Sequence, residues 1–294
     1  PPPPLPWSNR PATIIGICIT LTILCWLTTA FRLFARFFVI KKPWWDDLFV
    51  VLAVLAFTLS TVVACIDTRF GIGMRVMDVP LDHLKKVIEC QYIWGIAYVS
   101  STAFIKISLL LQYLRVFEAG TYTYRFTQCI LVLVSLWGFA FLFISLFPCF
   151  PSPSAFWEMT YKGCYGFASP NWVTLTNMIK GHSASNFCLD ILVLLLAIRL
   201  QFLSDVPSTR RAMTAVLFLG LLACSFALWR LVDVVKTGAG AGTDPTFNEP
   251  GPILLSIAEI YLAASCATIP FFWPVLKDQF NKIFVQYEVN VSSE

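Results

Sequence analysis

Seven long stretches almost without charge are the feature of this sequence that most restricts its fold. A bilayer core is about 30 Å thick and needs about 20 apolar residues at a helical rise of about 1.5 Å each. The helices of a soluble protein keep a polar face for water, and these stretches leave none. We therefore expect an all-α integral membrane protein, a bundle of seven transmembrane helices. The expected spans are 12–31, 48–66, 90–114, 126–147, 183–198 (starting near 172), 212–235 and 253–275.

The composition excludes soluble and nucleic-acid-binding classes of protein. Of the 294 residues 57% are hydrophobic and 13% charged, whereas soluble domains are about 25% charged. The net charge is only +4, so we expect the lipid bilayer and no nucleic acid as a partner. The ten cysteines form no C-x-x-C pair, and we expect no metal site. The apolar stretches are continuous rather than alternating, which disfavours a β-barrel.

The distribution of basic residues predicts the orientation. Lys and Arg are more frequent in the first, third and fifth connections and in the tail than on the opposite side, and the first connection holds Arg32, Arg36, Lys41 and Lys42. By the positive-inside rule the N-terminus lies outside and the C-terminus in the cytosol. The expected parts are a proline-rich extracellular lead-in (1–11), the seven-helix domain (12–277) and a cytosolic tail (278–294). A multi-pass protein of the plasma membrane is expected.

Two charges are expected to meet at one depth inside the bundle. Lys106 in the third span and Asp190 in the fifth both lie about 12 Å from the inner end at helical rise. Buried charges in membranes normally pair, so we expect them to meet directly or through water. The pair is either an interhelical clamp or a switch or ligand site. The polar stripes that carry it also include Tyr98, Thr102 and Asn186.

A second pair of charges is expected nearer the outer face. Arg230 lies five residues from the end of the sixth span, and Glu259 six residues into the seventh. Asp233, one turn from Arg230, could share that partner. The group is either a structural ion pair or the lining of an outward-facing ligand pocket.

At the inner face the sequence predicts a contact between an arginine and aspartates. Asp46 and Asp47 open the second span, where acids suit the positive end of the helix dipole. Arg115, at the inner end of the third span with Tyr113, is a candidate partner for either aspartate. A cytosolic latch of these four residues would form a two-state element.

Four cysteines are expected at the oxidising outer face, where disulfides can form. They are Cys65, Cys90, Cys149 and Cys164. Four cysteines allow three pairings, and sequence does not choose between them. We favour a bond between Cys149 and Cys164, and the alternative joins Cys90 to Cys164.

Taken together, these residues resemble the fungal rhodopsin-domain family, which includes GPCR-like fungal receptors and a membrane protein of a satratoxin gene cluster. The match extends from about residue 12 to residue 277. Each motif alone is weak, but their order over seven spans is specific. The matching residues are Trp44, Asp46, Asp47, Lys106, Ser108, Tyr113, Arg115, Phe117, Cys149, Pro151, Trp157, Cys164, Asn186, Asp190, Gly220, Arg230, Glu259, Cys266, Pro270 and Pro274.

The resemblance implies a GPCR-like receptor for a small or apolar cue, with a heterotrimeric G protein as a partner and an unidentified small-molecule ligand. We expect no cofactor, and in particular no retinal, because the seventh span has no lysine and Lys277 lies beyond it. The alternative is a membrane-embedded enzyme, such as a cyclase or hydrolase, or an accessory protein of a secondary-metabolite pathway. In such an enzyme Asp190 and Glu259 would be general acids. A transporter is the third hypothesis.

Overall fold

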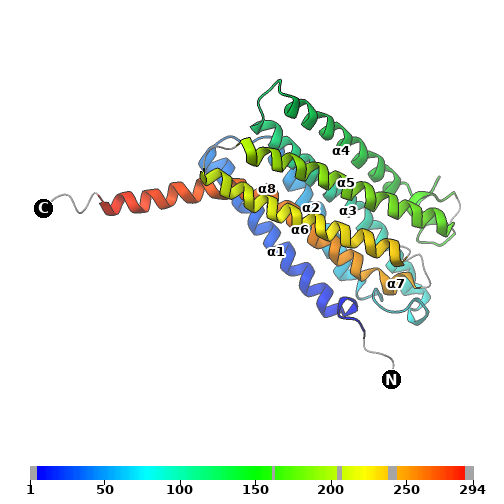
Figure 1. Ribbon diagram of the computed structural model, residues 1–294. Helices are drawn as coiled ribbons and strands as arrows, with labels where there is room; N and C mark the ends of the chain where they lie inside the picture. Colours follow the sequence, from blue (N-terminus) through cyan, green and yellow to red (C-terminus); the bar gives the residue numbers. More distant parts are fainter. Residues whose placement is uncertain (1–4, 161–162, 204–206, 238–243, 289–294) are drawn as a thin grey trace.

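The chain folds as a bundle of long helices that run side by side (Figure 1). A computed structural model describes residues 5–160, 163–203, 207–237 and 244–288, and their side chains over 5–160, 163–202, 213–237 and 244–269. The long helices are α1 (Pro11–Phe34), α2 (Trp45–Asp67), α3 (Leu81–Val116), α4 (Tyr122–Leu146), α5 (Trp172–Leu203), α6 (Pro207–Thr237) and α8 (Pro250–Glu288). Short turns are η1 (Trp7–Asn9), η2 (Ala35–Ile40), η3 (Val76–Asp78), η4 (Pro153–Ala155), η5 (Gly166–Ala168) and α7 (Pro245–Asn248).

The structure has the seven candidate membrane-spanning helices that the sequence predicts. Over the described residues seven helices are long and apolar enough to cross a bilayer. The beginning of α1 and the end of α8 lie at opposite ends of the structure (Figure 1). We call the end at which α1 begins the amino end and the opposite end the carboxyl end. These names describe the two ends of the bundle and not the two sides of a membrane.

Three helices extend furthest beyond the predicted spans. The first continues through η2, a π-helical segment that ends at Lys41 in a left-handed conformation. The third begins at Leu81 rather than near Cys90, because its first turns carry charged residues that water can solvate, including the Lys86–Glu89 pair at 2.7 Å. The last helix passes residue 277, which was the expected end of the domain, and reaches Glu288. Residues 1–4 of the lead-in and 289–294 of the tail lie outside the described residues.

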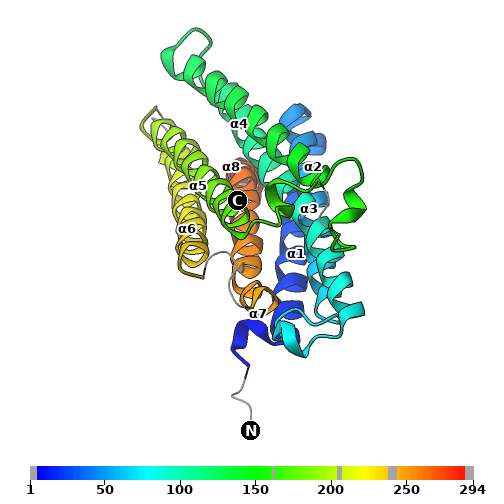
Figure 2. The ribbon, with the colours of Figure 1, turned by 90° about the vertical axis from the view of Figure 1, so that its right-hand side faces the viewer.

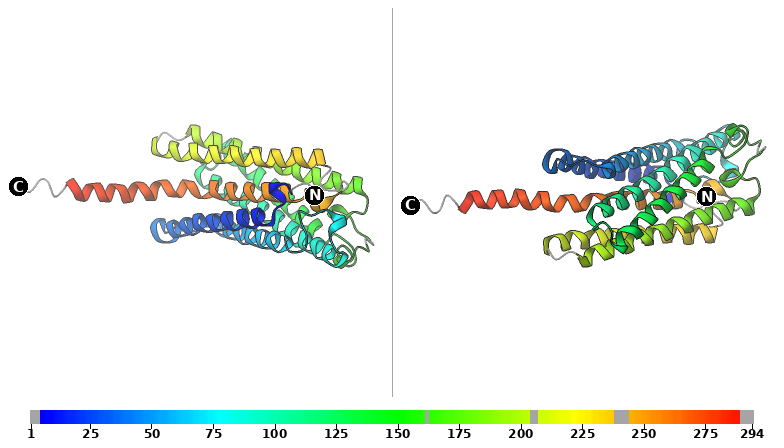
Figure 3. Two further views of the ribbon diagram at one scale, coloured as in Figure 1. Left: turned by 90° about the horizontal axis from the view of Figure 1, so that it is seen from below. Right: turned by 90° about the horizontal axis from the view of Figure 1, so that it is seen from above.

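Helix α8 lies in the middle of the bundle. It packs against α6 on one side and against α1, α2 and α3 on the other, as the end-on and side views show (Figures 2 and 3). The core between the helices is apolar and includes Phe57, Leu110, Leu196 and Ile257, all almost fully buried. Helix α4 packs on α3 at Gly138, where an added Cβ would lie 2.7 Å from the Cβ of Ala103.

The outward surface of the bundle carries many large apolar side chains. Phe139 on α4 and Trp229 on α6 are 71% and 64% exposed, and α1 exposes Ile19, Ile23 and Leu27. Water-facing helices avoid such continuous apolar surfaces, whereas lipid tails solvate them. The distribution of exposed side chains therefore agrees with a membrane-embedded bundle.

A network of hydrogen bonds closes the amino end. The side-chain amide of Asn9 donates to the carbonyl oxygens of Gly73 (3.1 Å) and Phe247 (2.7 Å). The Gly73 N–H donates to the carbonyl of Thr246 at 2.9 Å, and the Thr246 hydroxyl donates to that of Met74 at 2.8 Å. These bonds tie together the segment before α1, the connection between α2 and α3, and α7. We refer to them as the amino-end clasp.

Replacing Gly73 with alanine should destabilise this clasp. Gly73 has φ +89°, and an added Cβ would lie 2.7 Å from the carbonyl oxygen of Asn9. Strain of this kind costs about 1–3 kcal/mol, so Gly73→Ala should lower the thermal unfolding midpoint in detergent. Gly16→Ala is the matched control, because its Cβ would meet nothing within 4 Å and φ is helical. Equal midpoints for the two variants would contradict the interpretation.

Candidate functional site

A buried polar network lies in the middle of the bundle. Lys106 of α3 and Asp190 of α5, which the helix depths predict to meet, form an ion pair at 2.8 Å. The Lys106 ammonium also donates to Oδ1 of Asn186 at 2.8 Å. Lys106 is 3% exposed, and Asn186 is fully buried. The Lys106 ammonium is therefore desolvated, and without its partner its charge would be costly.

Arg230 and Glu259 belong to the same network. The Arg230 guanidinium lies 3.2 Å from Oε2 of Glu259 and donates to the hydroxyl of Ser183, also at 3.2 Å. The Asn186 amide donates to Oε1 of Glu259 at 2.7 Å and to Oδ2 of Asp190 at 3.2 Å. The sequence treats the two ion pairs as separate groups at different depths. The structure joins them through Asn186, because an amide can accept from Lys106 and donate to both carboxylates.

The network is balanced in charge. Two cations and two carboxylates from α3, α5, α6 and α8 meet around Asn186. Among the described residues the hydrogen bonds of the Arg230 side chain go to Glu259 and Ser183 rather than to Asp233. Asp233 was expected to share Arg230, and this pairing is not seen. Each carboxylate is already paired with a cation, so neither resembles a free general acid.

The remaining residues of the predicted stripe differ in their roles. Tyr98 packs its ring against the Arg230 guanidinium, 5.3 Å from it, and stacks on Trp94. The Thr102 hydroxyl instead donates to the carbonyls of Tyr98 and Val99 in its own helix, both at 3.0 Å. A buried threonine often satisfies its hydroxyl in this way, and Thr102 therefore does not join the network.

A cavity of about 190 Å³ lies between the network and the amino end. Helices α3, α4, α5, α6 and α8 form its walls, together with the connection between α4 and α5. Arg230 and Ser183 line it, so its wall includes members of the network. The other lining residues are Gln91, Tyr92, Trp94, Gly95, Tyr98, Val99, Ser145, Pro148, Phe156, Phe167, Ile179, His182, Val234, Glu249, Pro252, Ile253 and Ser256.

Aromatic rings surround the buried His182 beside this cavity. Its imidazole lies 4.7 Å from the ring of Phe141 and 5.2 Å from that of Trp137, with Tyr98 and Phe167 slightly farther away. Trp137 also lies 6.0 Å from the Lys106 ammonium and donates to the Ser185 hydroxyl. The aromatic cluster therefore touches both the cavity and the charged network.

A smaller cavity, of about 40 Å³, lies on the carboxyl side of the network. Asp190 and Tyr113 both line it, with Cys224, Cys266 and Gly220. Tyr113 was expected in the latch at the end of α3. It is buried inside the bundle instead, because its ring packs among α3, α5 and α8 rather than against the aspartates. Neither cavity is lined by both Asp190 and Glu259.

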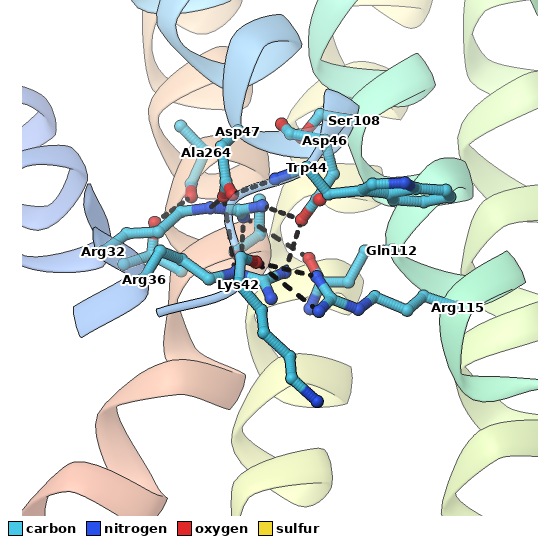
Figure 4. Close-up of polar contacts among 12 residues, drawn as sticks. Arg32, Arg36, Lys42, Trp44, Asp46, Asp47, Ser108, Gln112, Arg115 and Ala264 are labelled. Atoms are coloured by element: carbon cyan, nitrogen blue, oxygen red, sulfur yellow. Dashed lines mark hydrogen bonds and ion pairs between the residues drawn. The ribbon is translucent and has the colours of Figure 1, made fainter. Parts of the chain in front are cut away.

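A second ionic cluster holds the carboxyl end (Figure 4). Asp46 pairs with Arg32 and with Arg36, the latter at 2.7 Å, and Asp47 accepts from Arg32 Nε at 3.0 Å. Asp47 also accepts from the backbone N–H of Trp44 at 3.1 Å, which fixes the first turn of α2. We name Arg32, Arg36, Asp46 and Asp47 the carboxyl-end cluster.

The carboxyl-end cluster ties four helices together. Arg32 donates to the carbonyl of Ala267 in α8 and, at 3.4 Å, to the side chain of Gln112 in α3. Ser108 of α3 donates to the backbone carbonyl of Asp46 at 2.7 Å. Arg32 and Asp46 have no exposed surface. The cluster is therefore a buried tie among α1, α2, α3 and α8.

The predicted pairing of Arg115 with Asp46 or Asp47 is wrong. Arg115 donates weakly to the carbonyl of Lys42, at 3.4–3.5 Å, and lies 5.9 Å from the ring of Trp44. Arg32 and Arg36 take the aspartates because they reach them from inside the bundle, whereas Arg115 lies at the exposed edge. Arg32 and Arg36 were assigned to a loop, although their spacing of four residues places them on one helix face.

The favoured disulfide is confirmed. Cys149 and Cys164 are bonded, and they close the connection between α4 and α5 at the amino end. Cys90, the alternative partner of Cys164, is a free and buried cysteine of α3. Since the closed connection contributes Phe156 to the cavity wall, the disulfide also shapes the cavity.

Coupling between the two ion pairs should depend on Asn186. Asp190→Asn and Glu259→Gln each remove one carboxylate that accepts from the Asn186 amide. Their effects on the free energy of unfolding should deviate from additivity by about 0.5–3 kcal/mol. In an Asn186→Ala background the deviation should fall toward zero. Unfolding in mixed micelles measures this deviation. The control combines Asp190→Asn with Asp82→Asn, whose effects should add. Additive effects of Asp190→Asn and Glu259→Gln would contradict the network.

Asp46→Asn should destabilise the protein far more than Arg115→Gln. Removing one partner of a buried ion pair costs about 3–5 kcal/mol because the other charge remains buried, whereas exposed ion contacts contribute about 0–1 kcal/mol. Thermal unfolding in detergent compares the two variants. A larger loss of thermal stability for Arg115→Gln than for Asp46→Asn would instead support the pairing of Arg115 with these aspartates.

Comparison with known proteins gives the same assignment. The fungal rhodopsin domain model matches residues 31–278. The chain is also similar to "Fugralins biosynthesis cluster protein 2" of Gibberella zeae, with 25% identity over 277 residues, 90% of this chain and 65% of that protein. The chain thus spans slightly less than two thirds of that relative's length. The chain belongs to the fungal rhodopsin domain family.

Proposed function

We propose that the chain is a GPCR-like receptor that binds a small, mostly apolar cue in the cavity at its amino end. One observation carries this proposal: the cavity is lined by Arg230, which belongs to the buried network. A ligand in the cavity would therefore touch a group that is bonded, through Glu259 and Asn186, to Lys106 and Asp190. The proposed ligand site and the buried charged network are therefore in direct contact.

The network offers a route from the cavity to the carboxyl half. Asp190 lines the small cavity that also holds Tyr113 and Cys266. A ligand that draws Arg230 away from Glu259 would change the partners of Asn186 and then those of Asp190. Such a rearrangement acts as a signal if it favours a second packing of α6 against α8. Those two helices supply Arg230 and Glu259.

We infer that the amino end faces outward and the carboxyl end the cytosol, in the plasma membrane. The Cys149–Cys164 disulfide lies at the amino end, and disulfides persist in oxidising compartments. Lys42, Arg115 and Lys41 are exposed at the carboxyl end, as the positive-inside rule requires of a cytosolic face. This basic end is where a heterotrimeric G protein would bind.

Retinal does not fit the residues of the last span. A retinal Schiff base needs a lysine amine, and residues 244–269 contain no lysine. No lysine lines the larger cavity either, among the residues that the structure describes. We propose that the protein works without a chromophore.

A second candidate function is supported by the relative's name. "Fugralins biosynthesis cluster protein 2" is by its name a member of a biosynthetic cluster. A role for this chain in making or handling a metabolite, as an enzyme, an accessory protein or a transporter, would fit that context. The pairing of both buried carboxylates with cations favours the receptor over acid–base catalysis.

The receptor proposal predicts a response that depends on the cavity wall. In a strain lacking the gene, the intact chain should restore a response to extracts of small molecules. Trp94→Ala should reduce that response strongly at equal surface abundance, because Trp94 lines the cavity. The matched control is Trp26→Ala, whose indole bonds Thr58 at the partly exposed face of α1.

Other outcomes would favour the second candidate. A missing or altered metabolite in the deletion strain, with an unchanged response to every extract, would support a biosynthetic role. Accumulation of a cue inside vesicles carrying the purified chain would support transport. An equal loss of response in Trp94→Ala and Trp26→Ala would contradict the assignment of the cavity as the site.

A further inference from the structure

Three residues of the larger cavity wall carry buried polar atoms without a hydrogen-bond partner. They are Nε1 of Trp94, the hydroxyl of Tyr98 and Nε2 of His182. Tyr98 and His182 are each 4% exposed. Buried polar groups are nearly always satisfied, because an unmade hydrogen bond is costly. Three unsatisfied atoms around one cavity therefore indicate that something absent from the chain itself supplies their partners.

The size of the cavity restricts what can enter it. Its volume is about 190 Å³, and an apolar cavity of about 150 Å³ accommodates benzene. Drug-sized ligands use sites of about 300–1,000 Å³. The cavity therefore fits a single ring with one small substituent. Rings of Tyr92, Trp94, Phe156 and Phe167 line it, and they stack well on a planar ring.

The polar atoms restrict the chemistry of the substituent. The indole of Trp94 can only donate, so the ligand must carry an acceptor, while a phenol hydroxyl can donate or accept. A carboxylate would face Glu249, which lines the same cavity, and would compete with Glu259 for Arg230. An ammonium could pair with Glu249, but it offers no acceptor to the Trp94 indole, whose N–H would stay unsatisfied. An uncharged oxygen can form hydrogen bonds with the unpaired polar atoms of the cavity wall, and it adds no charge to the cavity.

We propose that this cavity binds an uncharged monocyclic aromatic or similarly unsaturated molecule that carries a carbonyl or hydroxyl oxygen. The proposal rests on the proposed function and names the class of its ligand. The oxygen accepts from Trp94 and bonds Tyr98 or His182, and the ring packs among the aromatic side chains. No covalent step is involved.

A series of probes with one ring size tests the class. The chain in lipid nanodiscs is titrated with toluene, benzaldehyde, benzoate and benzylamine, and binding is measured by ligand-observed NMR against protein-free nanodiscs. Benzaldehyde should bind about fivefold more tightly than toluene, the change that one ordinary hydrogen bond produces. Benzoate and benzylamine should bind more weakly than benzaldehyde. Tighter binding of either charged probe, or equal binding of all four, would overturn the proposal.

Two conservative variants locate the contact. Trp94→Phe removes only the N–H and should reduce the preference for benzaldehyde over toluene, because one hydrogen bond to the oxygen is lost, while toluene still binds. Trp26→Phe, the matched change in α1, should leave the preference intact. An unchanged preference in Trp94→Phe would place the oxygen elsewhere and contradict the proposal.

The result separates this inference from the receptor proposal. If no probe binds while cells still respond to an extract through Trp94, the ligand class is wrong and the receptor stands. If the probes bind as expected while no extract evokes a response, the cavity chemistry stands and the receptor proposal fails.

Discussion

A charge inside a bilayer must find a partner of opposite sign, and this constraint arranges every long helix of the bundle except α4. Hydrocarbon offers no water to solvate an ion, so the free-energy cost of burying a charge is offset only when the ions pair. Such pairing involves Lys106, Asp190, Arg230 and Glu259. They come from four helices, and Asn186 joins them because an amide donates and accepts at once. The helices that carry them therefore have little freedom to rotate about their own axes.

Two ionic clusters at different depths share α3 and α8. The central network joins these helices to α5 and α6, while the carboxyl-end cluster joins them to α1 and α2. Helix α4 enters neither cluster through an ion pair of the described residues. It is held instead by the close contact of Gly138 with Ala103 and by the hydrogen bond of Trp137. The α4 side of the cavity is thus held by packing, and its α6 and α8 sides by charge.

The sequence was informative wherever a single physical rule determined the outcome. Hydropathy located seven spans because lipid requires uninterrupted apolar length, and equal depth brought Lys106 to Asp190. It was less informative where several helices meet. The link through Asn186 depends on how α5 faces α8, and the partners of Asp46 depend on η2, whose π-helical turns carry Arg36 to within 2.7 Å. The spacing of residues along the sequence predicts neither the facing of α5 toward α8 nor the π-helical turns of η2. The four-residue spacing of Arg32 and Arg36 ahead of two aspartates was a usable signal.

Charge balance also connects the cavity with the network. Arg230 already has Glu259 and Ser183 as partners, so the wall presents no unneutralised cation to a ligand. An anion would have to displace Glu259, and the freed carboxylate would then lie buried beside Asn186 without its partner. A neutral oxygen imposes no such change on Glu259. It can still shift the position of the Arg230 side chain through Tyr98, on whose ring the guanidinium rests. An uncharged ligand in the proposed site would therefore act on the network by geometry, and the network would remain electrically balanced with and without it.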